Sequence, residues 1–115
     1  MEKTIIYHNN RCTKSRCALE LIEKKTKDFS VIEYLKTSPS EKELKEILKK
    51  LGMKAEEIIR KKEPLFREKF ERKKFSENEW IKILAKNPIL IERPIVVKGN
   101  KAVIGRPTEN ILKLF

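Results

Sequence analysis

Apolar residues in the first third of the chain fall into two short runs with a helical pattern between them. Residues 4–7 form a β-prone run that stops at the polar residues 8–11, and apolar positions at 18–22 then recur at helical spacing. The next apolar run, residues 31–35, predicts a second strand. Because a helix connects the two strands, we expect a β-α-β unit with parallel pairing.

The middle of the chain carries the spacing of several helices. Ser40 and Glu43 form the pattern of a capping box before an apolar stripe at residues 44–51, which predicts a helix there. A further short helix is expected over residues 55–60, ending near Pro64. This part of the chain therefore predicts helical rather than sheet structure.

A second capping box is expected at Ser76 and Glu79, and it opens another helix. Phe75 precedes this box and is placed to pack on Trp80 as a hydrophobic staple. The charged residues 60–74 have few apolar anchors, so their structure is the least defined by the sequence.

Two strands and a short helix are predicted at the C-terminal end. Residues 94–97 and 102–104 are β-prone, and the turn between them contains Gly99-Asn100, a good hairpin turn, so antiparallel pairing is expected. Apolar positions after Thr108 predict a closing helix.

The predicted order is β-α-β, then helices, then β-β-α, which is how thioredoxin-like domains are ordered. A chain of 115 residues is near the common size of one domain. We therefore expect a single α/β domain over residues 1–115, with a mixed four-stranded sheet and a helical insertion at about residues 40–86.

The amino-acid composition of the chain limits the classes of molecule that we expect the protein to bind. The 28 Lys and Arg against 17 Asp and Glu give a net charge of +11 that attracts anions of any kind, although most lysines lie beside glutamates on predicted helix faces, as on an ordinary solvated surface. Two tyrosines and one tryptophan, without aromatic and basic residues interleaved, argue against nucleic acid. No apolar stretch approaches the roughly 20 residues of a membrane span or the core of a secretory signal, so we expect a cytoplasmic protein with no membrane partner.

Cys12 lies where a polar, basic loop turns into the first predicted helix. Unpaired amides and the positive end of the helix dipole there would lower the pKa of its thiol and favour the thiolate. The neighbouring Arg11, Lys14 and Arg16 act in the same direction. The same amides, with the hydroxyls of Ser15 and Thr13 as donors, would form a cradle for an anion. The alternative, a small buried cysteine, fits poorly in so polar a loop.

Cys17 and His8 each have two interpretations. Cys17 lies more than one helical turn from Cys12, so a direct disulfide would need the first turn to distort. It is either an ordinary helix residue or a resolving or regulatory thiol. His8, the single histidine, either raises the thiolate fraction of Cys12 or hydrogen-bonds the loop, and the alternative is a capping or surface position. One histidine and two ill-spaced cysteines predict no metal site.

Three arginines stand at the expected ends of elements. Arg60 lies at a helix end, Arg93 before a strand, and Arg106 after a strand. Guanidinium groups bind tetrahedral oxyanions through several donors and can stabilise charge that shifts during attack. The three are therefore candidate oxyanion ligands, with an ordinary surface position as the alternative for each.

Several segments resemble the signatures of one known family. Residues 7–16, which read YHNNRCTKSR, resemble the catalytic loop of the glutaredoxin-coupled arsenate reductases, the ArsC family. Residues 88–97 together with 105–107 resemble its second signature, and residues 60–64 resemble its middle segment. The resemblance thus covers essentially the whole chain. The chain stops at Phe115, whereas the best-characterised reductases have a longer C-terminal tail, so it resembles the short members of the family.

The resemblance implies a reduction of arsenate to arsenite, the chemistry of arsenic detoxification. Cys12 would attack arsenic, assisted by His8 and Ser15. Glutathione would then add to the adduct as a co-substrate, and glutaredoxin would resolve the mixed species, without any tightly bound cofactor. We expect the protein to act as a monomer.

The resemblance also assigns the remaining candidates. Pro94 matches the structural cis-proline that thioredoxin folds place opposite the active cysteine. Cys17 departs from the common family loop and is a candidate resolving thiol. The residues that would bind the oxyanion and its arsenic adducts are Arg60, Arg93 and Arg106.

Two other functions stay open at this point. The same cysteine and arginines could serve a thiol oxidoreductase with another substrate. A related branch of the fold regulates transcription by docking on RNA polymerase, and the basic residues 60–74 could make such a contact. Ser15 argues against that branch, which commonly has a second cysteine at this position.

Overall fold

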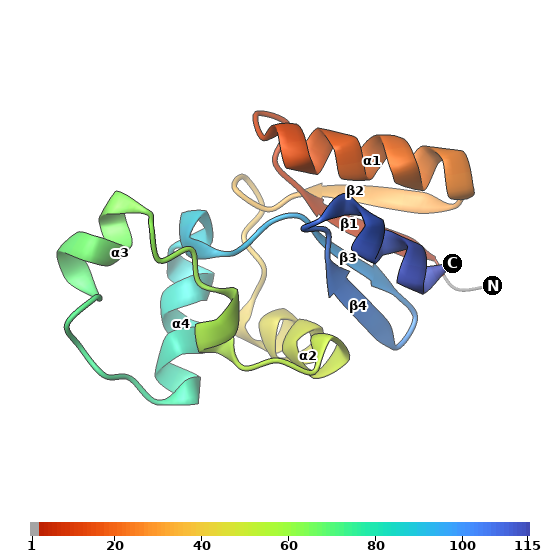
Figure 1. The fold of residues 1–115 in the computed structure, drawn as a ribbon. Coiled ribbons are helices and arrows are strands. Elements are labelled where there is room, and N and C mark those ends of the chain that lie inside the picture. Colours follow the sequence, from red (N-terminus) through yellow and green to blue (C-terminus); the bar gives the residue numbers. More distant parts are fainter. Residues whose placement is uncertain (1–2) are drawn as a thin grey trace. The chain divides into compact units, whose positions relative to one another are not determined.

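The computed structural model describes residues 3–115, which form two compact units. One unit joins the chain up to Thr37 with Arg93–Phe115, and we call it the sheet unit. The other, Ser38–Glu92, is the helical unit. Figure 1 shows the elements of each. The expected insertion at about residues 40–86 falls inside the helical unit.

The sheet unit contains a four-stranded mixed sheet. Its strands are β1 (Thr4–His8), β2 (Phe29–Glu33), β3 (Ile95–Lys98) and β4 (Lys101–Ile104). Their order across the sheet is β2-β1-β3-β4, as Figure 1 shows. The β1–β2 pair is parallel, and the β1–β3 and β3–β4 pairs are antiparallel. The predicted α/β class, mixed sheet and C-terminal hairpin are therefore confirmed.

Several strand boundaries differ from those predicted, most clearly those of β1 and β2. β1 continues through His8, which is only 5% exposed, rather than stopping before it. β2 ends at Glu33, so the apolar residues 34–35 are not part of the strand. Instead, the Glu33 carbonyl accepts hydrogen bonds from the N–H groups of Lys36 and Thr37, both at 2.9 Å. This turn ends the strand although the apolar run continues.

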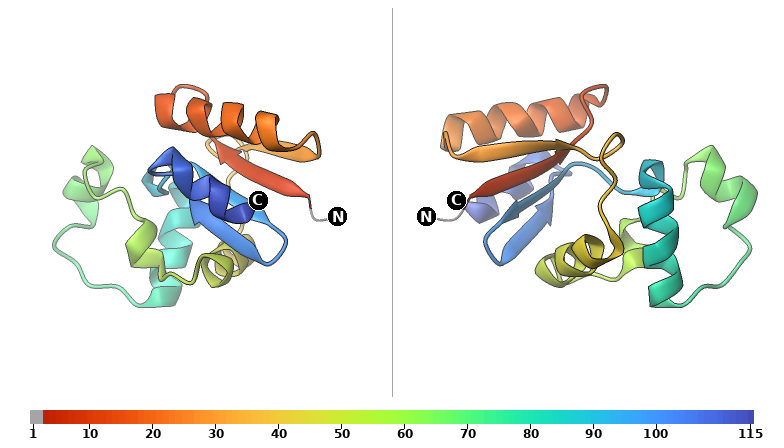
Figure 2. Two further views of the ribbon diagram at one scale, coloured as in Figure 1. Left: turned by 45° about the vertical axis from the view of Figure 1, so that its right-hand side comes forward. Right: turned by 180° about the vertical axis from the view of Figure 1, so that it is seen from behind.

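The core of the sheet unit lies between the sheet and two helices, α1 (Thr13–Lys25) and η3 (Thr108–Leu114). Both helices lie along the sheet in Figures 1 and 2. η3 is a 3₁₀ helix at the position where a short helix was predicted. Burying each large aliphatic side chain there contributes about 1.5–3 kcal/mol to the stability of the fold. The buried cluster consists of Ile6, Ala18, Ile22, Val96, Ile111 and Leu114.

The helical unit contains three α-helices and two short 3₁₀ helices. They are α2 (Glu41–Leu51), η1 (Ala55–Ile58), α3 (Pro64–Lys69), α4 (Glu77–Lys86) and η2 (Pro88–Leu90). The Ser40 hydroxyl accepts a hydrogen bond from the Glu43 N–H at 3.1 Å, which satisfies one of the free amides at the start of α2. α2 ends at Gly52, whose φ of 68° is readily adopted by glycine.

The second predicted cap is confirmed in full. The Glu79 N–H donates to the Ser76 hydroxyl at 3.2 Å, and the Ser76 N–H donates to the Glu79 carboxylate at 3.0 Å. The predicted contact of Phe75 with Trp80 is also present, with ring centroids 4.7 Å apart. Phe70 packs against both rings, so the charged stretch before α4 is anchored by aromatic contacts.

The middle of the helical unit differs from the prediction. The helix expected over residues 55–60 is the shorter η1, and Ile59 instead forms a β-bridge with Ile91. Pro64 does not terminate a helix but is the first residue of α3. Proline suits this position because the first N–H of a helix has no intrahelical partner.

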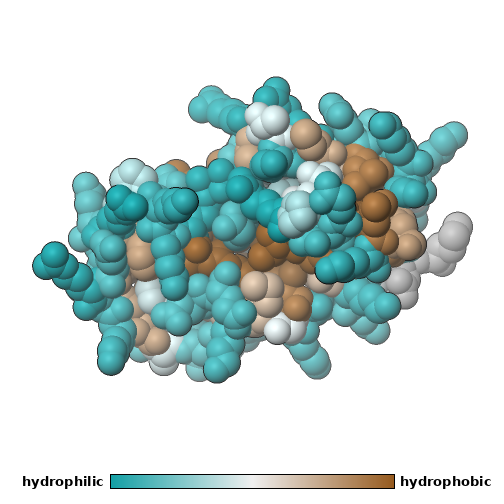
Figure 3. Space-filling model, viewed as in Figure 1, coloured by the Kyte–Doolittle hydropathy of each residue, from teal (hydrophilic) through white to brown (hydrophobic). Residues whose placement is uncertain are grey.

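Polar side chains cover much of the face shown in Figure 3. Within residues 3–115, no helix combines the length and the apolar character needed to cross a membrane.

Gly105 generates a prediction about the packing of the sheet unit. A Cβ atom at this position would lie 3.0 Å from Pro94 Cγ and 3.1 Å from Ile111 Cδ1. We expect Gly105→Ala to lower the free energy of unfolding by about 1–3 kcal/mol through overpacking, measured by urea denaturation. The exposed Lys101→Ala in β4 is the matched control. Equal stability of the two variants would contradict this packing.

Candidate active site

Hydrogen-bond contacts of Ser15, in the first turn of α1, connect this helix to the end of β1. The Ser15 side chain is fully buried. The Ser15 Oγ lies 2.7 Å from His8 Nδ1 and accepts a hydrogen bond from the Asn9 N–H at 3.0 Å. A buried hydroxyl with both contacts holds the intervening loop in one arrangement.

The loop between β1 and α1 carries Cys12. The Asn9 carbonyl accepts a hydrogen bond from the Cys12 N–H at 3.0 Å, and the Asn9 side chain accepts one from the Arg11 N–H at 3.1 Å. The Cys12 carbonyl accepts from the Arg16 N–H at 3.0 Å, so Cys12 is the N-cap residue of α1. Its half-buried thiol therefore lies at the positive end of the helix, as predicted.

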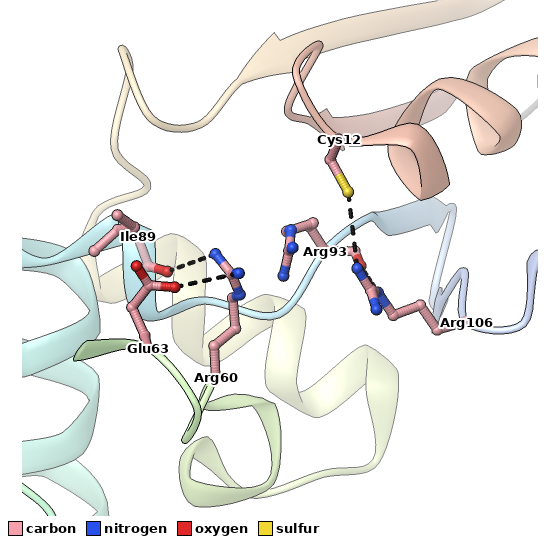
Figure 4. A network of polar contacts seen from close by, with 6 residues as sticks. All are labelled: Cys12, Arg60, Glu63, Ile89, Arg93 and Arg106. Atoms are coloured by element: carbon pink, nitrogen blue, oxygen red, sulfur yellow. Dashed lines mark hydrogen bonds and ion pairs between the residues drawn. The ribbon is translucent and has the colours of Figure 1, made fainter. Parts of the chain in front are cut away.

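Arg93 and Arg106 lie beside Cys12. Arg106 Nε donates to the Arg93 carbonyl at 2.8 Å, and Arg106 Nη2 lies 3.7 Å from Cys12 Sγ. Figure 4 shows the Cys12 side chain directed toward this pair. The Gly105 N–H donates to the Pro94 carbonyl at 2.8 Å, which fixes the end of β4 against the start of β3. The Arg93–Pro94 and Arg106–Pro107 peptide bonds are both cis.

The surroundings of Cys12 favour its thiolate form. Burial by itself raises the pKa of the Cys12 thiol, but the N–H groups of Ser15 and Lys14 and the positive charge of Arg93 together outweigh burial. The pKa of Cys12 is therefore below its ordinary value. A thiolate is the nucleophilic form of cysteine, so this residue is suited to attack an electrophile.

The pKa of the His8 imidazole is below its ordinary value. Burial lowers the pKa of its imidazole, while the negative charge of Glu33 and the contact with Ser15 act in the opposite direction. The alternative of a capping or surface position for His8 is wrong, because His8 is the buried last residue of β1. The structure brings it to Ser15, the residue whose N–H favours the Cys12 thiolate.

Arg60 belongs to the helical unit. Its guanidinium lies 3.2 Å from the Glu63 carboxylate and donates to the Ile89 carbonyl at 3.3 Å, contacts that Figure 4 also shows. The prediction placed Arg60 at the end of a helix. In the structure Arg60 instead follows Ile59, the residue that forms the β-bridge with Ile91. Both members of the ion pair are largely buried, which orders this side chain within its unit.

Cys17 is exposed on α1, and both cysteines are free thiols. Its assignment as a resolving thiol stays a prediction. Among residues 3–115, no group of three or more His, Cys, Asp or Glu side chains is arranged to hold a metal ion.

Sequence reasoning missed two residues that support the site. Asn9 accepts two of the hydrogen bonds that shape the loop. Glu33 is the parallel partner of His8 in the sheet, and its negative charge acts to raise the pKa of the His8 imidazole. The predicted β-α-β unit makes the two strands parallel neighbours, but the prediction placed Glu33 inside the second strand, and only the observed register sets it opposite His8.

Comparison with known proteins identifies the family. The model of the ArsC family matches residues 7–114. The chain belongs to the ArsC family. Its membership confirms the resemblance inferred from the catalytic loop and the second signature, and the thioredoxin-like fold agrees with the solved ArsC structures.

Similar proteins match this ArsC member over nearly their full length. The arsenate reductase of Neisseria meningitidis serogroup A is 41% identical over 113 residues, covering 96% of this chain and 97% of that protein. The Escherichia coli K12 protein YfgD, which is described as uncharacterized, is 43% identical over 111 residues, covering 95% and 93%. The solved structure of arsenate reductase from Vibrio cholerae aligns with a TM-score of 0.93 at 40% identity, covering 99% of this chain and 98% of that one.

The first prediction from the site concerns the ionisation of Cys12. In a Cys17→Ser background, the thiolate absorbance should titrate below the ordinary pKa of a cysteine, since Cys12 is then the single thiol. Arg93→Ala should raise this pKa, because it removes a positive charge that favours the thiolate. Lys101→Ala removes an exposed charge of the same sign and should leave the pKa unchanged. An identical midpoint in the Arg93 and Lys101 variants would refute the assignment.

A second prediction concerns His8, the single histidine, whose ring proton gives one unambiguous NMR titration curve. Its midpoint should lie below the value of about 6.5 for a free imidazole. Glu33→Gln should lower the midpoint further, because the Glu33 charge favours the imidazolium. The exposed Glu20→Gln on α1 is the control and should have no effect. A midpoint that rises in the Glu33 variant would contradict the described contact.

Proposed function

We propose that this protein is an arsenate reductase that reduces arsenate to arsenite through a covalent adduct on Cys12. The observation that carries the proposal is the position of Cys12. Its thiol lies at the N-terminus of α1, has a lowered pKa, and faces two arginines. The relatives named arsenate reductase, which match nearly the whole chain, support the choice of substrate.

The first step is attack of the Cys12 thiolate on arsenic. A bond forms between Cys12 Sγ and arsenic, one arsenic–oxygen bond breaks, and the oxygen leaves as water after taking up two protons in total. Arsenic stays in the +5 state. Arg93 and Arg106 stabilise the negative charge of the oxyanion during this attack, because guanidinium groups offer several donors to a tetrahedral anion.

The next steps bring in two external thiols, for which we propose glutathione and glutaredoxin. Glutathione condenses with the adduct, forming a sulfur–arsenic bond and releasing a second water. A glutaredoxin thiolate then attacks the glutathione sulfur, so that a mixed disulfide forms and the electron pair of the broken bond reduces arsenic to the +3 state. Hydrolysis of the remaining bond releases arsenite and restores the Cys12 thiol.

The other residues have supporting roles in this proposal. Ser15 and His8 assist by holding the loop that presents Cys12. Arg60 is proposed as a third oxyanion ligand on the basis of the family resemblance, and Pro94 as the structural cis-proline. The two external thiols each give up one electron when they join in a disulfide, and these two electrons reduce arsenic. The chemistry therefore needs one protein cysteine and no tightly bound cofactor. We propose a monomeric, cytoplasmic enzyme.

Turnover tests this proposal directly. NADPH consumption should require arsenate, glutathione, glutaredoxin and glutathione reductase together, and it should fall to background in Cys12→Ser. Replacing Arg93 or Arg106 by Ala should reduce kcat/KM for arsenate by about tenfold or more, since each loses a charge-assisted contact with the oxyanion. Arg60→Ala tests the third ligand in the same assay.

Cys17→Ser is the matched control for Cys12→Ser, because it removes the exposed thiol and leaves the site intact. Full turnover by this variant would show that Cys17 is not the resolving thiol. Absence of any arsenate-dependent turnover, with a Cys12 that still reacts with iodoacetamide, would overturn the proposed substrate and favour another thiol reaction.

A further inference from the structure

A cavity of about 310 Å³ opens beside the Cys12 loop within the sheet unit. It lies between the loop that follows β1 and the turn that follows β2. None of the steps described above occupies it. Its volume is at the lower end of the range of about 300–1,000 Å³ common for small-molecule sites.

The lining of this cavity has charges of both signs. Arg11 contributes a cation from the loop, Lys36 contributes one from the turn, and Glu33 contributes a carboxylate. Leu35 adds an apolar surface, with 42% of its area exposed. The side chains of Asn9 and Asn10 add amide groups. Such a lining suits a small zwitterion that carries more than one carboxylate and an ammonium group.

The same lining disfavours arsenate. A compact divalent oxyanion would meet the Glu33 carboxylate in this cavity, whereas at Cys12 it meets Arg93 and Arg106. The two regions therefore differ in the ligand that they select. Arg11 immediately precedes Cys12 in the chain, so the cavity borders the loop that carries the reactive thiol.

We propose that this cavity binds the external thiol co-substrate, a peptide thiol of the glutathione type. Its two carboxylates would pair with Arg11 and Lys36, and its ammonium group with Glu33. This inference rests on the proposed function, because it assigns a binding site to a reactant of that reaction. It adds the residues that select the reductant, which are distinct from those that bind the oxyanion.

The ion pair already present does not prevent this binding. Lys36 Nζ lies 3.6 Å from the Glu33 carboxylate, with the two side chains 76% and 42% exposed. An exposed pair of this kind contributes little to stability. A ligand that offers a carboxylate to Lys36 and an ammonium group to Glu33 replaces the pair with two opposite-charge contacts.

The test uses S-methylglutathione, which keeps the three charges of glutathione but has no free thiol and therefore starts no turnover. Titration into the ¹⁵N-labelled full chain should shift the amide signals of residues 9–11 and 33–36. Lys36→Ala and Arg11→Ala should each weaken binding about fivefold, the loss expected for one partly screened charge contact. Lys101→Ala, an exposed lysine at the β3–β4 turn, is the control for net charge and should bind as the wild type does.

Kinetics provide a second measurement. Lys36→Ala should raise KM for glutathione about fivefold while KM for arsenate stays unchanged. Signals that shift elsewhere, or equal binding by the Lys36 and Lys101 variants, would overturn the assignment of the cavity.

Arsenate reduction driven by dithiothreitol separates this inference from the proposed function. Dithiothreitol has no charges for the cavity to recognise. If it supports reduction that depends on Cys12 while S-methylglutathione fails to shift residues 9–11 and 33–36, the cavity assignment is wrong and the reductase stands. If no thiol supports reduction that depends on Cys12, the proposed function is wrong, and the titration still decides whether the cavity binds the peptide.

Discussion

The arrangement of the active loop depends on the buried Ser15. Its hydroxyl contacts the His8 ring at the end of β1 and the Asn9 N–H in the loop, while its own N–H favours the Cys12 thiolate. One residue thus connects the strand, the loop and the first turn of α1. Because an unpaired buried hydroxyl is costly, these contacts are made together, and they determine where the sulfur lies.

Segments distant in sequence from Cys12 also form part of the surroundings of its thiol. A Cβ atom at Gly105 would lie only 3.0 Å from Pro94 Cγ, and next to this tight contact Arg106 donates to the Arg93 carbonyl. The two arginines add positive charge beside the sulfur, where the N–H groups of Ser15 and Lys14 already favour negative charge. A site that stabilises its own thiolate in this way also attracts an anionic substrate, so the nucleophile and the oxyanion are brought together by the same charges.

Features that depend on local sequence were the most predictable. The capping box at Ser76, the β3–β4 hairpin and the position of Cys12 at a helix start all follow from residues close together in the chain. The end of β2 did not, because its apolar run continues into a turn. The burial of His8 and its pairing with Glu33 depend on the register between two strands, and the contact of Arg93 with Arg106 depends on tertiary packing. The positions of these arginines at the expected ends of elements made them candidates, and the family resemblance assigned them to the oxyanion, but periodicity alone could not bring them together.

Intact-protein mass spectrometry after incubation with arsenate and glutathione, in the absence of glutaredoxin, shows whether arsenic becomes bonded to Cys12, since the resolving thiol is then missing. We expect an arsenic adduct in the wild type and in Cys17→Ser, mapped to Cys12 by peptide analysis, and no adduct in Cys12→Ser. An adduct that persists in Cys12→Ser, or its absence from a wild-type protein with a reactive Cys12 thiol, would rule out the arsenic intermediate on Cys12.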